Sequence, residues 1–255
     1  QIIETSNRAA RGALRVGAGL VTLGCPPQAL AENAARLDAV MLRPLADGAG
    51  LAALLADGRI RALCLGPGLG TEGAAHDLVA AALAAGRPAV LDADALTLIA
   101  VRPDLTRALH PACVLTPHGG EFARLFPDLA ARMQGPVDRG PAFSRLDAAR
   151  AAAARAGCTV LLKGPDTVIA TPDGQAAIHA AVGDRAAPWL ATAGAGDVLA
   201  GLIAGLLARG QAPFPAACVA AWLHVEAARR FGPGLIAEDL PETLPAVLRD
   251  LMAAG

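Results

Sequence analysis

The stretch Ala191-Thr192-Ala193-Gly194-Ala195-Gly196-Asp197 decides how the rest of the chain is interpreted. It consists almost entirely of small residues and leads directly into an apolar segment, residues 198–207, which is typical of a buried helix. Backbone N–H groups can converge on an anion where side chains are missing, and the N-terminus of a helix adds a favourable dipole. We therefore predict an anion pocket at Gly194 and Gly196.

Asp197 follows this pocket in the first turn of the expected helix, residues 197–209. A carboxylate there can accept a proton from an attacking hydroxyl group, so Asp197 is our candidate general base. The stretch alone also fits an ordinary carboxylate at a helix N-terminus. Gly201 and Gly205 lie four residues apart in the same helix, where glycine costs about 1 kcal/mol relative to alanine, so we interpret them as points of close packing.

The rest of the chain alternates short apolar runs with longer Ala/Leu/Arg segments of helical period, which predicts an α/β fold. The expected strands are residues 20–23, 62–65, 89–91, 114–116, 159–162, 167–170 and 176–179, the last two forming an antiparallel hairpin. The expected helices are residues 8–16, 51–55, 73–85, 120–125, 146–156, 197–209, 215–231 and 241–252. Residues 126–144 contain three prolines and two glycines, so we expect a surface excursion there.

Length and composition favour a cytoplasmic enzyme of one domain, residues 1–255, whose N-terminal strand is missing or atypical. Hydrophobic residues make up 54% of the chain, but every apolar run is interrupted before about 18 residues, and no signal peptide is expected, so no membrane interaction is expected. The net charge of -1 is scattered along the chain, which argues against nucleic-acid binding. Five widely spaced cysteines without a CxxC pair indicate reduced core residues.

Three more turns follow expected strands, and each contains residues that could contact a ligand. They hold Gly68 in Gly66-Pro67-Gly68-Leu69-Gly70, the carboxylates Asp92 and Asp94, and His118 before Glu121. Ligands gather beyond the carboxyl ends of parallel strands, so we expect the three turns to line one crevice. Taken singly, each also fits a structural role: a strand-to-helix turn, a helix cap for Asp94 and an exposed turn histidine for His118.

Two further polar residues have less distinctive settings. Lys163 ends an expected strand, from where its ammonium group could reach nucleotide phosphates, although taken alone it fits a solvated hairpin lysine better. His224 lies within an expected helix with no second residue at metal-ligand spacing, so we interpret it as a packing or surface residue.

Six stretches together resemble the ADP/ATP-dependent NAD(P)H-hydrate dehydratases, a ribokinase-like family that restores NAD(P)H from its hydrated form. The resemblance runs from about residue 11 to residue 246. Its elements are GAGLVTL at residues 17–23, GPGLG at 66–70, LDADAL at 91–96, TPHGGE at 116–121, KGPDTVI at 163–169 and ATAGAGDVLAG at 191–201. It implies a ribokinase-like three-layer fold, with helices on both faces of a mostly parallel sheet.

The resemblance also implies which residues contact the substrates. Gly68, Asp94, His118 and Asp197 would contact the hydrated dinucleotide, NAD(P)HX, whereas Lys163, Gly164, Pro165, Asp166, Thr167, Gly194 and Gly196 would contact ADP or ATP. Asp197 would deprotonate the ring hydroxyl, which attacks the nucleotide's terminal phosphoryl group, and elimination of phosphate would follow. Mg²⁺ would offset the nucleotide's charge, but the sequence assigns it no ligand.

The resemblance extends to partners, and it leaves rival functions open. We expect a homo-oligomer, and an NAD(P)HX epimerase as a fused domain or a separate protein. A ribokinase-like kinase for a vitamin precursor would use the same pocket and base. A nucleotide sensor would keep the glycines but would not need Asp197.

Overall fold

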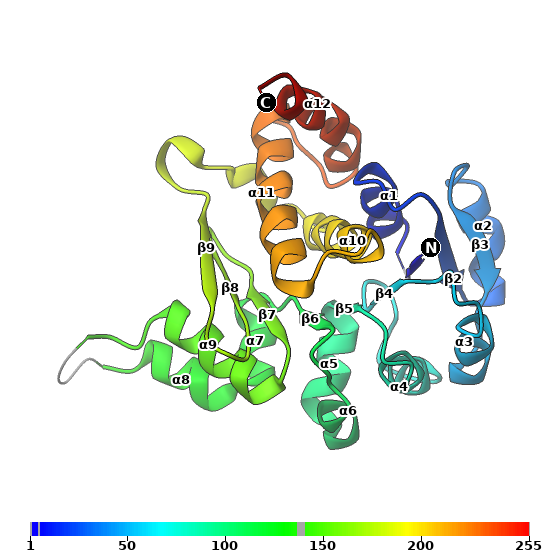
Figure 1. Cartoon of the computed structure of the whole chain (residues 1–255), viewed down its shortest axis with the longest axis horizontal. Helices are drawn as coiled ribbons and strands as arrows, with labels where there is room; N and C mark the ends of the chain where they lie inside the picture. The colour runs from blue at the N-terminus through cyan, green and yellow to red at the C-terminus, as the bar shows by residue number, and fades with distance from the viewer. Residues whose placement is uncertain (1, 5, 137–140, 255) are drawn as a thin grey trace.

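The structure, a computed structural model, describes residues 2–4, 6–136 and 141–254. Within these residues, nine strands form one sheet in the order β3-β2-β1-β4-β5-β6-β7-β8-β9 (Figure 1). The strands are β1 Ile2–Glu4, β2 Val21–Cys25, β3 Met41–Pro44, β4 Ala62–Leu65, β5 Ala89–Leu91, β6 Cys113–Leu115, β7 Thr159–Leu162, β8 Asp166–Ala170 and β9 Ala176–Ala180. Pairing is parallel from β3 to β7 and antiparallel for β7–β8 and β8–β9, which confirms the predicted antiparallel hairpin of the last two strands.

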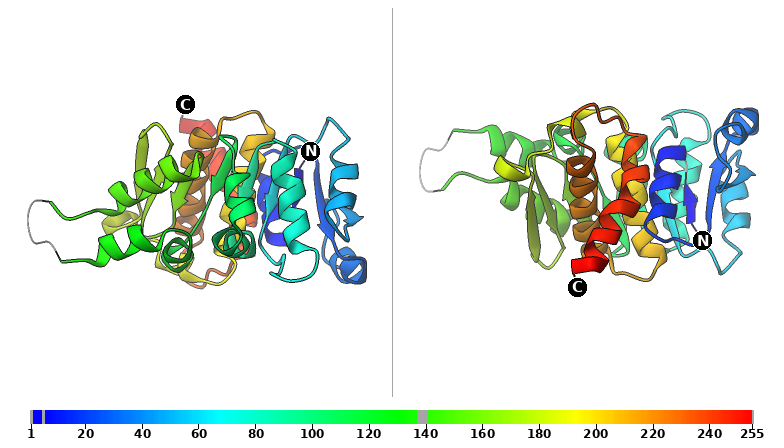
Figure 2. Two further views of the ribbon diagram at one scale, coloured as in Figure 1. Left: turned by 90° about the horizontal axis from the view of Figure 1, so that it is seen from below. Right: turned by 90° about the horizontal axis from the view of Figure 1, so that it is seen from above.

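Helices cover both faces of the sheet, which confirms the three-layer α/β fold (Figures 1 and 2). One face carries α1 Asn7–Arg15, α10 Ala195–Ala208, α11 Pro213–Phe231 and α12 Asp239–Ala254. The other carries α3 Gly48–Leu54, α4 Ala75–Ala84, α5 Ala93–Val101, α6 Pro103–Arg107, α7 Gly119–Leu125, α8 Pro127–Gln134 and α9 Arg145–Ala156. The short α2, Leu30–Ala34, precedes the edge strand β3. No helix in the described residues is long and apolar enough to cross a membrane.

The central strands are buried on both faces because successive side chains of a strand point to opposite sides. In β4, Leu63 and Leu65 belong to the core beneath α3–α9, whereas Cys64 belongs to the core beneath α1 and α10–α12. Four of the five cysteines, Cys25, Cys64, Cys113 and Cys158, are buried, in agreement with their interpretation as core residues.

Gly201 and Gly205 bring α10 against α1, which confirms their interpretation as packing positions. A Cβ atom on Gly201 would lie 2.0 Å from the backbone oxygen of Ala9, and one on Gly205 would lie 2.4 Å from Val16 Cγ1. Only residues without a side chain allow these two helices to approach so closely.

The structure corrects three expectations. A first strand is present, because Ile2–Glu4 pairs in parallel with both β2 and β4, and three residues are too few to show a periodicity in the sequence. The expected excursion at residues 126–144 contains helix α8, because Pro127 occupies the first helical position, where proline is compatible with a helix. Residues 137–140 of that stretch lie outside the described residues. Helix α10 begins at Ala195, two residues earlier than expected.

Candidate active site

The predicted site residues lie beyond the carboxyl ends of four adjacent parallel strands, β4 to β7. The turn that contains Gly68 follows β4, Asp92 follows β5, His118 follows β6, and Lys163 follows β7. This is the arrangement that the sequence predicted for the first three turns. The N-terminus of α10 lies at the same region of the sheet, because its residue Gly196 lies beside the side chains of Lys163 and Asp92.

The anion turn is formed by Gly194, Ala195 and Gly196 at the start of α10. Gly194 has a φ of +87°, a backbone conformation that favours glycine. A Cβ atom on Gly196 would lie 3.3 Å from Lys163 Nζ and 3.9 Å from Asp92 Oδ2. The absence of a side chain there leaves the first-turn amides of α10 and the lysine ammonium group facing the same space, so both can act on one anion.

Lys163 is the centre of a buried charge cluster. Its Nζ lies 2.7 Å from Asp92 Oδ1 and 3.7 Å from Glu121 Oε2, and the side chains of the two acids are only 2% and 7% exposed. Charges removed from water are tolerated in protein interiors when they are paired in this way. One ammonium group facing two carboxylates leaves the cluster with an excess negative charge, to which an added cation would be attracted.

Asp197 interacts electrostatically with Asp92 and Lys163 of this cluster and with Arg8. Its Oδ2 atom is 3.7 Å from Arg8 Nη1, and its side chain is 24% exposed. Burial and the neighbouring Asp92 raise the pKa of Asp197, while Arg8, Lys163 and a hydrogen bond from Ser6 oppose that rise. A carboxylate with a raised pKa is a stronger base, and the remaining exposure leaves it accessible to a ligand.

His118 is the N-cap of α7. Its Nδ1 accepts hydrogen bonds from the N–H groups of Gly120 (3.0 Å) and Glu121 (3.4 Å), and Glu121 Oε2 accepts from the N–H of His118 (2.8 Å). Because Nδ1 accepts, the proton of the neutral ring is on Nε2. The side chain is 55% exposed, and its Nε2 lies 3.5 Å from Glu121 Oε1.

Asp94 and Gly68 belong to one local arrangement. Asp94 Oδ2 accepts a hydrogen bond from the N–H of Gly70 (2.8 Å), which holds the Gly66–Gly70 turn against α5. Gly66 is the tightest point, because a Cβ atom there would lie 1.7 Å from the backbone oxygen of Asp92. Gly68 lines a hollow of about 290 Å³ together with residues of β2 and α4.

A large cavity beside these residues has a volume of about 520 Å³. Its polar end is formed by Lys163, Gly164, Thr167, Gly196 and His118, and its walls are mainly apolar. The wall residues are Pro165, Ala181, Ala186, Ala187, Pro188, Leu190, Ala191, Ala195, Leu199, Ala221 and Val225. One large apolar cavity with a cationic end is a suitable shape for a flat ring joined to phosphate groups.

The comparison with protein families agrees with this geometry. Residues 8–246 match the model of the family described as NAD(P)H-hydrate dehydratase. The chain belongs to the NAD(P)H-hydrate dehydratase family.

Two named relatives illustrate the match of this dehydratase-family chain. It is 40% identical over 258 residues to the bifunctional NAD(P)H-hydrate repair enzyme Nnr of Moorella thermoacetica, covering 95% of this chain and 46% of that protein. It is 41% identical over 174 residues to the ADP-dependent (S)-NAD(P)H-hydrate dehydratase of Neisseria meningitidis serogroup B, covering 66% of this chain and 54% of that protein. The chain thus spans about half the length of these relatives.

Solved structures share the fold of the dehydratase-family chain. An ADP/ATP-dependent NAD(P)H-hydrate dehydratase from Bacillus subtilis, co-crystallised with ATP/Mg²⁺, superposes with a TM-score of 0.74 at 26% identity, covering 98% of this chain and 88% of that one. A ribokinase-like superfamily protein from Enterococcus faecalis gives a TM-score of 0.77 at 22% identity, covering 98% and 86% of the chains. The second likeness concerns the fold alone and agrees with the predicted ribokinase-like architecture.

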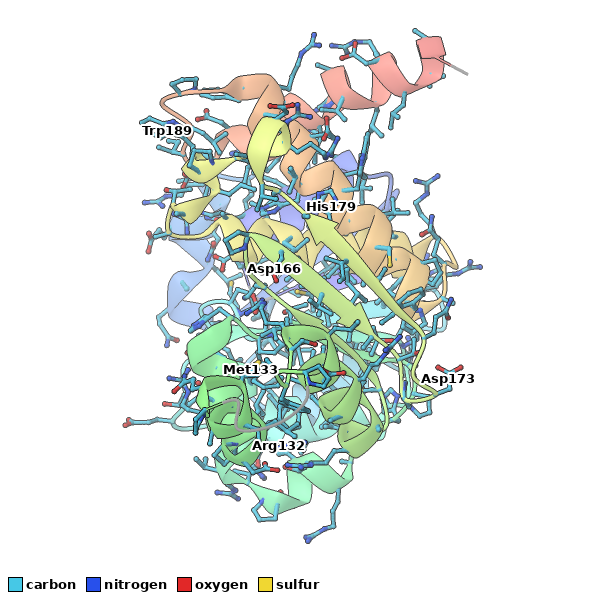
Figure 3. The ribbon with its side chains drawn as sticks, turned by 90° about the vertical axis from the view of Figure 1, so that its left-hand side faces the viewer. Arg132, Met133, Asp166, Asp173, His179 and Trp189 are labelled. Carbon is cyan, nitrogen blue, oxygen red and sulfur yellow. The ribbon has the colours of Figure 1, made fainter. Side chains whose placement is uncertain are left out.

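Not all predicted contact residues of the dehydratase-family chain share one cavity. Gly68 lines the smaller hollow and His118 the larger cavity, so the expected single crevice consists of two hollows. Asp166 does not line the large cavity; its Oδ1 lies 3.1 Å from Arg145 Nε. Figure 3 shows Asp166 and His179 at one end of the β8–β9 hairpin and Asp173 at its turn. Gly194 lies beneath the Arg8 side chain.

Sequence reasoning missed the buried partners of Lys163 and the role of His224. Asp92 is the carboxylate that pairs with Lys163. His224 is buried, as expected for a packing residue, but it also lines the large cavity, and its Nε2 is 2.9 Å from the backbone oxygen of Ala195. Burial lowers the pKa of His224 to about 4, so the neutral ring donates from Nε2 to the first residue of α10.

Proposed function

We propose that the chain catalyses the ADP- or ATP-dependent dehydration of (S)-NAD(P)HX to NAD(P)H. Membership of the NAD(P)H-hydrate dehydratase family supports the reaction class, and the Neisseria meningitidis relative is named for ADP and for the S-epimer. The Bacillus subtilis structure is named for both ADP and ATP. We therefore assign the enzyme to the carbon–oxygen lyases.

The observation that carries this proposal is the position of Asp197 beside the anion turn. A carboxylate that is partly buried, has a raised pKa and adjoins helix amides can take a proton and face a transferring phosphoryl group at the same time. A protein that only sensed nucleotides would gain nothing from a base in that place.

Asp197 removes the proton of the ring hydroxyl group. The hydroxyl oxygen attacks the terminal phosphorus of the nucleotide at the same time. The bond to the leaving nucleotide breaks, so ADP leaves as AMP and ATP as ADP. The new phosphate group then departs with the electrons of its carbon–oxygen bond, and a proton leaves the neighbouring ring carbon, which restores the ring double bond. The amides of Gly196 and Asp197 and the Lys163 ammonium group face the charge on the transferring phosphoryl group.

The phosphoryl donor is assigned to the large cavity. Its apolar walls suit the adenine ring, and Lys163, Gly164, Thr167 and Gly196 lie at the end suited to phosphates. Pro165 is part of the wall, while Asp166 and Gly194 would act through the backbone of the same two turns. The hydrated dinucleotide is assigned to the region between His118, Asp197 and Gly68, with Asp94 holding the Gly68 turn in place.

The donor set of the chain fits Mg²⁺ carried by the nucleotide. Within the described residues, no three His, Cys, Asp or Glu side chains gather as a metal site, and Mg²⁺ commonly uses one or two carboxylates with phosphates and water. Asp92 and Glu121, which share one lysine, are the carboxylates that would face it. When bound, Mg²⁺ offsets the negative charge of the phosphates.

The wider setting of the enzyme is also part of the proposal. We propose a single ribokinase-like domain that acts in the cytoplasm as a homo-oligomer, and that works with an NAD(P)HX epimerase. The bifunctional name of the Moorella thermoacetica relative supports the last point.

The test is an assay of the purified protein with ADP or ATP, Mg²⁺ and hydrated NADH. Recovery of the absorbance of reduced nicotinamide, together with one inorganic phosphate and one AMP or ADP per NADH formed, is the expected result. No NADH, but a stable phosphorylated alcohol from a vitamin precursor, would replace the proposal with the kinase.

A further inference from the structure

Arg8 connects the N-terminal helix to the anion turn. Its Nε atom lies 2.8 Å from Glu238 Oε1, and its Nη1 atom lies 3.7 Å from Asp197 Oδ2. The same guanidinium group covers the glycine turn, because a Cβ atom on Gly194 would lie 2.9 Å from Arg8 Nη1. One side chain thus contacts the residue that precedes α12, the anion turn and the candidate base.

We propose that Arg8 is a positioning residue for Asp197: fixed by Glu238, its guanidinium group orients the Asp197 carboxylate and keeps it ionised beside the anion turn. The inference deepens the proposed function, on which its kinetic part rests. It assigns the first turn of α1 to the reaction centre, although neither the candidate motifs nor the glycine turns include that helix.

The charges around Asp197 explain why such a residue is needed. Burial and Asp92, at the end of β5, both favour the protonated form of Asp197. Lys163, at the end of β7, opposes them, but it is already shared between Asp92 and Glu121. Arg8 and the hydroxyl group of Ser6 also oppose them, and the other carboxylate that Arg8 contacts is Glu238.

The geometry favours arginine over lysine at this position. Arg8 uses one nitrogen for Glu238 and another for Asp197, and the planar guanidinium group fixes the angle between the two contacts. A lysine ammonium group keeps the charge but cannot hold both carboxylates in that arrangement. Arg8→Lys should therefore keep Asp197 ionised but place it less well.

The chain also provides a matched control. Arg11 lies one turn later on α1, and its Nη2 atom is 2.6 Å from Glu242 Oε1. Arg15 holds the other oxygen of Glu242, so the contact between α1 and α12 survives the loss of Arg11. Arg11→Gln removes an equivalent charge and ion pair from the same helix without touching the anion turn.

The experiment follows the carboxyl carbon of Asp197 by NMR during a pH titration of the ligand-free protein, and repeats the dehydration assay over the same pH range. In Arg8→Gln the midpoint of Asp197 should rise by about one pH unit, and the acid limb of kcat should move with it. Arg11→Gln should leave both unchanged. Arg8→Lys should keep the midpoint near that of the wild type but have a lower kcat, with little change in KM for the nucleotide.

Two results separate this inference from the proposed function. An Asp197 midpoint that is the same in Arg8→Gln and the wild type would overturn the role of Arg8, even in an active dehydratase. A shifted midpoint in a protein that does not dehydrate the hydrate would support the contact between Arg8 and Asp197 and reject the proposed function.

Discussion

Gly201→Ala tests the packing that brings α1 to the anion turn. The added methyl carbon would lie 2.0 Å from the backbone oxygen of Ala9 and 2.6 Å from its Cα atom, whereas a relaxed contact needs more than 3.4 Å. Overpacking of this kind costs about 1–3 kcal/mol, and a backbone obstacle puts the change near the upper end. Alanine regains about 1 kcal/mol of helix propensity, which leaves a net loss of about 2 kcal/mol.

For a chain of this size, such a loss lowers Tm by about 4–8 °C, which thermal unfolding followed by circular dichroism would detect. Gly119→Ala is the matched control, because Gly119 is also helical but a Cβ atom there would meet nothing within 4 Å. It should be neutral or slightly stabilising. If Gly201→Ala melted at or above the temperature of both the wild type and the control, the close approach of α1 and α10 would be wrong.

Three further substitutions test the site and its surroundings. Lys163→Met leaves buried carboxylates without their cation and should lower the free energy of unfolding, measured in urea, by about 3–5 kcal/mol. Adding Asp92→Asn should recover part of this loss, and equal stability of the single and double variants would contradict the charge cluster. Hydrogen bonds to two aspartates raise the pKa of His76, so the stability that His76 gives the folded protein is fully present below the ordinary pKa of 6.5 and is lost as the pH rises through the folded-state value. His76→Gln should therefore be less stable than the wild type at about pH 6 and equally stable at about pH 9. A difference in stability that is the same at both pH values would refute this. His224→Phe removes the donor to Ala195 and should cost about 1–3 kcal/mol, whereas unchanged thermal unfolding would show that the contact is unimportant.

The sequence predicted most of the sheet and the glycine turns because both depend on local chemistry. Buried parallel strands require continuous apolar runs, such as Ala62–Leu65, and close backbone approaches require glycine, as at Gly66 and Gly201. Both constraints can be recognised from the residue types alone. The strand Ile2–Glu4 was missed since its stability comes from the partners on both sides of it.

The internal contacts of the site could not be predicted in the same way. Asp92 and Asp94 are two residues apart, and no pattern shows that the first turns inward to Lys163 while the second holds Gly70. Arg8 lies 189 positions before Asp197, and their contact depends on the packing of α1 against α10. The division of the expected crevice into two hollows likewise depends on how the turns fold over the strand ends.

The role of Asp197 as the base that starts dehydration is tested most directly by the rate at which Asp197→Asn forms NADH. Asparagine has the size of aspartate but cannot take the proton, and loss of a general base costs roughly 10²-fold or more. With ADP, Mg²⁺ and hydrated NADH, Asp197→Asn should form NADH at least about 100-fold more slowly than the wild type, with unchanged Tm. A variant that formed NADH within a few-fold of the wild-type rate would contradict the account.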